Sequence, residues 1–356
     1  MESINYREGG SEYIAGLIKT AVQDGSRTAT VSGDFIIDRE IRLPSGFTLV
    51  LEDCRLRLAD GSFTNMFVNE HHDTELGRTT EGTDRNITIL GRGTAVLDGG
   101  KYNGLSERNS GKDGMPPIYK NNLLLFTNVD GFRITGISCK NQRWWALNFV
   151  YCSNGYIGNV DFCASDIGID EQGNEYHGLR RAKYDQVLVK NADGIDLRLG
   201  CHHITIENIT GFTEDDTVAL TALGGGLEKR FGVEGVCSDI HHITVKNIVC
   251  SAFCTIVRML NQSGYKLHDI DVDGVRDTSA DSAHLDKGLY AVRVGDVRLY
   301  GTRHATKEET YNISIKNVYG RSDYALSLAG DMENLTIENI ECGDACQLLL
   351  DQRVTK

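Results

Sequence analysis

A short phrase recurs along most of this chain: a polar residue, two apolar or β-branched residues separated by a polar one, and then Asn or Gly. It reads His-Ile-Thr-Ile-Glu-Asn-Ile at residues 203–209 and Asn-Ile-Ser-Ile-Lys-Asn-Val at residues 312–318. Matching positions are 23 residues apart from Ile134 to Ile157. A unit this short cannot bury its own apolar face, so successive units must stack on one another.

The repeat predicts an all-β fold, a right-handed parallel β-helix. Alternation within each unit is typical of a strand, and like-oriented units one coil apart pair in parallel through right-handed crossovers. Asn and Gly suit the bends because they tolerate left-handed backbone angles. A β-propeller needs a unit about twice as long, and a β-sandwich also fits less well.

The first part of the chain predicts a helix over about residues 10–25, with Ser11 as its N-cap, which would cover the end of the solenoid. The coils are expected over about residues 28–350, and residues 1–356 are expected to form a single domain. Three segments break the rhythm, at residues 99–121, 164–184 and 277–310. Such extra residues are expected to form loops beside a binding face.

The charge balance limits the partners. A formal net charge of −13 argues against nucleic acid or an anionic membrane surface as a general partner, and a polyanionic sugar would need a local basic patch. The chain has no run of 18 apolar residues, and its start lacks the basic and apolar regions of a leader peptide. We therefore expect a cytoplasmic protein, and the sequence leaves a homo-oligomer open.

The ten cysteines contain no Cys-x-x-Cys pair. In a large cytoplasmic chain they are expected to be reduced, buried small side chains rather than a disulfide framework. The pairs Cys250/Cys254 and Cys342/Cys346 have no histidines at ligand spacing. The sequence therefore predicts no metal site and no cofactor.

Two acidic motifs organise the centre of the chain: Asn-Ala-Asp-Gly-Ile-Asp at residues 191–196 and Thr-Glu-Asp-Asp-Thr-Val-Ala-Leu at residues 213–220. Asp193 and Asp215 are 22 residues apart, which is one coil of the predicted solenoid. Neighbouring rungs lie about 4.8 Å apart, so these carboxylates can face one small volume. Paired carboxylates of this kind suit acid and base catalysis on a glycosidic bond. Asn and Asp that only cap turns of the coil are the alternative.

Both motifs resemble those of the polygalacturonases, family 28 of the glycoside hydrolases. Residues 191–196 are similar to the family motif Asn-Thr-Asp-Gly-Ile-Asp, and residues 213–220 to its Gly-Asp-Asp-x-Val/Ile-Ala motif, at the same one-coil separation. Residues 91–100 and 144–149 also look like characteristic segments of that family. The resemblance covers roughly residues 30–340.

The resemblance implies a role for each of three aspartates. Asp215 would be the general acid, while Asp193 and Asp216 would hold and deprotonate the attacking water. The reaction would invert the anomeric configuration, with carboxylates about 6.5–9.5 Å apart to admit that water. Like-charge repulsion within the cluster would raise one pKa and keep a proton available.

The chain departs from the family pattern at two substrate-binding positions. No Gly-His-Gly motif follows the aspartate pair; His241 or His242 would have to substitute, although both also suit a turn. The family's Arg-Ile-Lys motif, which grips the substrate carboxylate, reads Arg258-Met-Leu here, so Leu260 replaces the lysine. A neutral or differently charged sugar is then an alternative to galacturonate.

Three further residues are candidates for substrate contact. Trp144 and Trp145 offer aromatic faces for a sugar ring, with plain packing as the alternative. Asn191 belongs to the first acidic motif and is expected beside the substrate.

The sequence thus predicts an inverting glycoside hydrolase for an oligosaccharide substrate, such as a pectin-derived one. A β-helix lyase or epimerase that uses calcium, with Arg258 as base, is the second hypothesis. A non-catalytic sugar-binding solenoid is the third.

Overall fold

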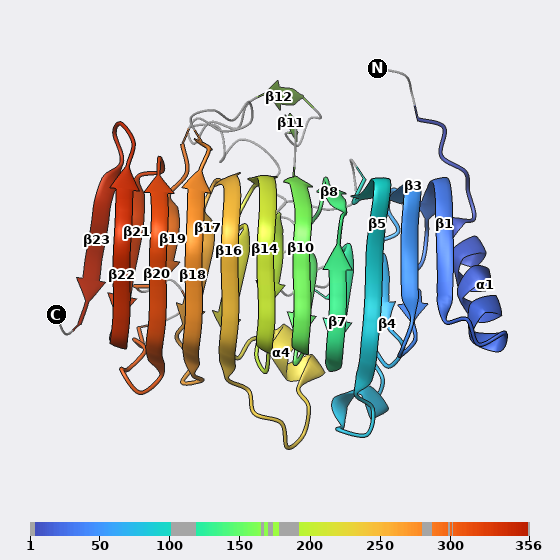
Figure 1. The fold of residues 1–356 in the computed structure, drawn as a ribbon, viewed down its shortest axis with the longest axis horizontal. Coiled ribbons are helices and arrows are strands. Elements are labelled where there is room, and N and C mark those ends of the chain that lie inside the picture. The colour runs from blue at the N-terminus through green and yellow to red at the C-terminus, as the bar shows by residue number, and fades with distance from the viewer. Residues whose placement is uncertain are drawn as a thin grey trace.

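In the computed structural model the chain winds into stacked coils, and most coils add one strand to each of two parallel sheets (Figure 1). The structure describes residues 4–100, 119–164, 167–169, 174–177, 192–279, 287–297, 300 and 302–354. The eleven-stranded sheet contains β1 (Thr28–Ile37), β3 (Thr48–Leu58), β5 (Asp84–Asp98), β7 (Val129–Thr135), β8 (Ser138–Lys140), β10 (Ser153–Cys163), β14 (His202–Thr213), β16 (Ile240–Ala252), β18 (Leu267–Asp277), β20 (Thr310–Gly320) and β22 (Glu333–Cys342). The ten-stranded sheet contains β2 (Ile41–Leu43), β4 (Phe67–Asn69), β6 (Leu124–Thr127), β9 (Trp145–Val150), β13 (Asp193–Leu197), β15 (Val218–Ala222), β17 (Thr255–Asn261), β19 (Tyr290–Val294), β21 (Tyr324–Gly330) and β23 (Gln347–Arg353). The predicted parallel β-helix is confirmed.

The repeated phrase stacks on itself in register. Ile204 pairs with Ile243, Ile243 with Ile270, and Ile270 with Ile313. All four side chains are buried, and together they form one ladder of the core between the two sheets. Because each rung covers the apolar face of the previous one, the stacking supplies the burial that a single unit lacks.

Asparagines mark the bends of the long strands, as the repeat predicts. Asn208 and Asn247 have φ of 57° and 50°, and the Nδ2 of Asn247 donates a hydrogen bond to the Oδ1 of Asn208 at 2.7 Å. Asn317 and Asn339 repeat this arrangement, also at 2.7 Å. The left-handed residue bends the strand, and its side chain connects neighbouring coils.

The longest helix among the described residues, α1 (Gly10–Gln23), covers the N-terminal end of the solenoid (Figure 1). Its apolar face buries Ile14 and Ile18 in the common core. The N-cap is Gly9, with φ of 77°, so the prediction of Ser11 was wrong. Ser11 lies inside the first turn, and its Oγ accepts hydrogen bonds from two backbone amides of the first coil at 3.0 and 3.2 Å.

Several short elements interrupt the coils. They are η1 (Leu76–Arg78), α4 (Gly226–Phe231) and an antiparallel hairpin of β11 (Ile167–Ile169) and β12 (Glu175–His177). The insertion that carries α4 was not predicted. The segment at residues 277–310 is not loop throughout, because β19 forms a regular rung within it. Much of the three irregular segments lies outside the described residues. None of the described helices is long and apolar enough to span a bilayer.

All ten cysteines are free thiols. The expectation that they are buried holds for Cys54, Cys139, Cys152, Cys201 and Cys250. It is wrong for Cys237 and Cys342, which are exposed.

Candidate active site

Adjacent strands β13, β15 and β17 carry side chains that form the floor of a cavity of about 220 Å³. Register places Asp196 beside Ala219 and Ala219 beside Arg258, and it pairs Thr221 with Leu260 in a second row. These positions alternate with residues that face the core. Because Ala219 is small, it leaves room between the charged side chains on either side.

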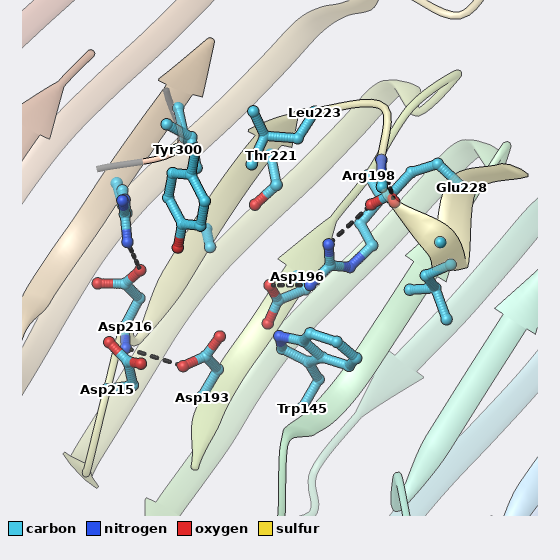
Figure 2. Close-up of a pocket in the computed structure, with 16 residues that line it drawn as sticks. Trp145, Asp193, Asp196, Arg198, Asp215, Asp216, Thr221, Leu223, Glu228 and Tyr300 are labelled. Atoms are coloured by element: carbon cyan, nitrogen blue, oxygen red, sulfur yellow. Dashed lines mark hydrogen bonds and ion pairs between the residues drawn. The ribbon is translucent and has the colours of Figure 1, made fainter. Parts of the chain in front are cut away.

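Residues from other elements form the walls of this cavity. Leu227 and Glu228 come from α4, Trp145 comes from β9, and Tyr300 lies near the other side (Figure 2). The unpredicted insertion that carries α4 thus contributes to the cavity. Tyr300 falls in one of the three irregular segments, where a loop beside a binding face was expected.

Asp193, Asp215 and Asp216 all line this cavity (Figure 2). Asp193 and Asp216 are almost fully buried, whereas Asp215 is partly exposed. The Oδ1 of Asp193 accepts a hydrogen bond from the backbone amide of Asp216 at 3.1 Å. The amide of Gly194 in turn donates to the carbonyl of Asp216 at 2.9 Å. Hydrogen bonds between adjacent coils therefore hold the two acidic motifs against each other.

The surroundings favour protonated forms within this cluster. Burial, followed by the nearby charges of Asp196, Asp215 and Asp216, raises the pKa of Asp193 well above its usual range. Burial also raises the pKa of Asp196, although the Arg198 guanidinium acts in the opposite direction. The protonated forms of Asp193 and Asp196 are therefore favoured more than in isolated aspartates.

Arg258 lies between two carboxylates. Its Nη1 donates to Oδ2 of Asp216 at 3.1 Å, and its Nη2 donates to Oδ2 of Asp296 at 2.9 Å. Arg258 is only 7% exposed. Asp296 also forms an ion pair with Arg293. Both terminal nitrogens of Arg258 are thus held by acidic residues of the protein itself.

Arg198 is held in the same way on the other side of the floor. It donates from Nη1 to Oε1 of Glu228 at 2.8 Å and from Nη2 to Oδ1 of Asp196 at 3.4 Å. Its guanidinium also lies 4.0 Å from the centre of the Trp145 ring. One face of Trp145 is therefore covered by an arginine.

The structure separates the other predicted substrate-binding residues. Trp144 is 1% exposed and packs in a buried apolar cluster, so it does not line the cavity. His241 and His242 belong to β16 of the eleven-stranded sheet, away from the cavity floor, and do not line it either. His242 has φ of 54°, which fits its alternative interpretation as a bend residue. Asn191 lies outside the described residues.

Sequence reasoning missed part of the site. Asp196 and Arg198 were not among the predicted site residues, but both line the cavity. Their signal was available, because Asp196 aligns with Ala219, an outward position of β15, and Arg198 follows two residues later, directly after the end of β13. Glu228 and Tyr300 had no such signal, since the repeat does not specify how an insertion packs.

Known structures with this fold include several that act on carbohydrates. An endo-xylogalacturonan hydrolase from Aspergillus tubingensis matches with 16% identity and a TM-score of 0.54, covering 97% of this chain and 94% of that one. A polygalacturonase from Erwinia carotovora ssp. carotovora matches with 15% identity and a TM-score of 0.51, covering 91% and 88%. An iota-carrageenase complexed to iota-carrageenan fragments matches with 12% identity and a TM-score of 0.54, covering 99% and 89%. At these identities the likeness shows the fold alone.

A comparison with curated proteins gives no match. The family model described as "Glycosyl hydrolases family 28" matches residues 64–252, just over half of the chain, including both acidic motifs. This chain therefore belongs to glycoside hydrolase family 28, a polygalacturonase-like family of inverting enzymes.

Proposed function

We propose that the protein hydrolyses a glycosidic bond of an oligosaccharide at the cavity on β13, β15 and β17. Asp215 protonates the leaving oxygen, while Asp193 and Asp216 hold the attacking water and take its proton. The observation that carries this proposal is the convergence of three aspartates from adjacent coils on one cavity. Such an arrangement suits a single displacement with inversion.

The differences among the three aspartates support these roles. Asp215 is the most exposed of the three aspartates, so an incoming glycosidic oxygen can reach its carboxyl group. Arg258 and the coil-to-coil hydrogen bond hold Asp216 and Asp193 in place, as water-positioning groups require. Burial and the neighbouring carboxylates raise the pKa of Asp193, which makes its carboxylate a stronger base toward the attacking water.

We further propose that the sugar bound at the cleavage position is neutral. The cavity is lined by Asp193, Asp196, Asp215, Asp216 and Glu228 but only two arginines among the described residues. Both arginines already pair with acidic side chains. A uronate would have to displace a buried acidic partner and leave that partner without its cation, which is costly. Galacturonate is the second candidate, favoured by the family and by the presence of Arg258.

A panel of oligosaccharides tests both proposals. Purified protein is incubated with neutral and with uronic oligosaccharides, and new reducing ends and new double bonds are measured together. We expect reducing ends from a neutral substrate and none from wild-type protein on oligogalacturonate. Proton NMR of the first product should show the inverted anomer. New double bonds that disappear with a chelator would contradict hydrolysis and favour the lyase.

The structure argues against Arg258 as the base of such a lyase. Burial opposes the charged guanidinium, but the two carboxylate partners outweigh burial and raise the pKa of Arg258 well above its ordinary value. A non-catalytic sugar-binding solenoid would bind an oligosaccharide without turnover in any assay.

The single domain over residues 1–356, the cytoplasmic location and a homo-oligomer stay predictions.

A further inference from the structure

A cluster of histidines lies on the eleven-stranded sheet, separate from the proposed active site. His202 pairs in register with His241, and His241 with His268, on the adjacent strands β14, β16 and β18. The rings of His202 and His241 stack at 4.9 Å, and those of His203 and His242 stack at 4.6 Å. Two columns of aromatic rings therefore run across successive coils.

Backbone conformation brings the two columns together. His203 and His242 each have φ of 54°, in the left-handed region. In a regular strand, consecutive side chains would point to opposite faces. Here His202 and His203 lie on one surface, with their Nδ1 atoms 2.9 Å apart, and His241 and His242 do the same at 2.8 Å. The following residues turn into the core.

The backbone does not require histidine at these positions. On the neighbouring rung of β10 the equivalent residues are Ser153 and Asn154, and on β20 they are Tyr311 and Asn312. Asn154 and Asn312 adopt the same left-handed conformation, with φ of 53° and 54°. The fold therefore does not explain why two consecutive rungs carry histidine at both positions.

Imidazole nitrogens are ligands for zinc, copper and nickel. One nitrogen from each of His203, His241 and His242 lies within 4.8 Å of the others. Two nitrogens bound to one tetrahedral Zn²⁺ at about 2.0–2.1 Å lie roughly 3.4 Å apart. His203 and His242 are exposed, so their rings are able to rotate toward this spacing without moving the core.

A carboxylate completes the surroundings. Asp269, on β18, takes the position that His242 has on β16, also with positive φ of 55°. Its Oδ2 lies 2.7 Å from Nδ1 of His268 and 3.9 Å from Nδ1 of His242. This carboxylate places a negative charge near His242, one of the three histidines, which favours a cation there.

We propose that His203, His241 and His242 form a binding site for a divalent transition-metal ion such as Zn²⁺, with Asp269 as the adjacent carboxylate. The ion joins β14 to β16 on a sheet that the cavity residues do not occupy. Because it binds only the folded arrangement, it stabilises the solenoid in proportion to its occupancy. It takes no part in turnover.

The test uses full-length protein without a polyhistidine tag, stripped of metal with a chelator and titrated with Zn²⁺ by calorimetry. We expect one equivalent to bind and the Tm to rise. His203→Asn and His242→Asn should each weaken the affinity at least about tenfold, and both should fold because Asn occupies this position on other rungs. His268→Tyr, which copies the stacked Tyr311 of the next rung, should bind Zn²⁺ more tightly than either Asn variant because His268 is not a ligand.

Three outcomes would overturn the site. The first is no measurable binding of Zn²⁺, and the second is equal affinity of the wild type and both Asn variants. The third is binding that disappears when the exposed thiols of Cys237 and Cys342 are alkylated and not when His242 is replaced. Removal of the metal should leave glycosidase turnover unchanged, so failure of this site and failure of the proposed function are distinguishable.

Discussion

Two regions of the solenoid share one rung spacing but differ in the burial of their polar side chains: the cavity floor on one sheet and the exposed ladders on the other. On the ten-stranded sheet, β13, β15 and β17 bury Asp193, Asp196 and Arg258 in a cluster of charges. On the eleven-stranded sheet, residues such as Asn247 and His242 lie exposed in ladders that repeat from coil to coil. The repeating coil therefore places polar side chains on both sheets, and burial raises the pKa values of Asp193 and Asp196 on the cavity floor.

The sharpest test of this contrast compares two aspartates. Asp215→Asn should lower kcat about 10²–10⁴-fold, because it removes the proposed proton donor. Asp161 lies on β10 and accepts a hydrogen bond from Thr210 at 2.7 Å on the exposed sheet. Asp161→Asn should leave kcat unchanged. Reducing-end assays on the substrate found in the oligosaccharide panel measure both variants.

Equal losses in the two aspartate variants would break the comparison, since a general folding defect would then explain both. Circular dichroism melts provide the control, and both variants should melt close to the wild type.

A second pair of variants compares two arginines by their effect on stability. Arg258→Met leaves Asp216 and Asp296 buried without their common cation, which should lower the free energy of unfolding by about 3–5 kcal/mol. Arg276 is exposed on β18, where its guanidinium lies 5.4 Å from the centre of the Tyr319 ring. Arg276→Met should cost less than about 1 kcal/mol. Urea denaturation measures both values, and a small cost at Arg258 would mean that the buried ion pairs add little.

The third prediction concerns pH. Unlike the arginine substitution, the substitution of Asp193 is expected to stabilise the protein. Because burial raises the folded-state pKa of Asp193, this group favours folding most at low pH. That contribution is lost as the pH rises from the unfolded-state value of about 3.9 through the folded-state pKa. Asp193→Asn cannot ionise, so its Tm should exceed that of the wild type by a margin that grows from pH 4 to pH 8. Activity should be lost in the same variant.

Thermal melts at several pH values check this prediction. A constant Tm difference across that range would show that ionisation of Asp193 does not destabilise the folded state.

The smallest effect is expected from the exposed ladder. Asn247→Ala removes the hydrogen bond to Asn208 and places alanine at φ of 50°, which should cost roughly 1–2 kcal/mol. Asn247→Gly accepts that conformation and should recover part of the loss. Neither variant should change kcat. A loss of activity here would mean that the two sheets are coupled more tightly than their separate side-chain clusters suggest.

The sequence was informative where the repeat or a motif acts directly. Alternation and the coil length predicted the parallel sheets and brought Asp193 next to Asp215 and Asp216. The choice of His241 or His242 as a substitute for the family's histidine did not place either residue at the cavity, because both belong to β16 of the other sheet. The repeat could not place Glu228, because the position of α4 follows from tertiary packing of an insertion rather than from any period.

The two ends of the stack differ, and this has a consequence for how the molecule opens. Helix α1 covers the first coil, whereas the last coil leaves Leu348 and Val354 exposed at 54% and 65%. Amide protons of β22 and β23 should therefore exchange with deuterium earliest, by fraying that needs no global unfolding. In the ten-stranded sheet β19 and β21 separate the strands of the proposed active site from the edge strand β23. An enzyme molecule whose last rung has frayed can still turn over its substrate.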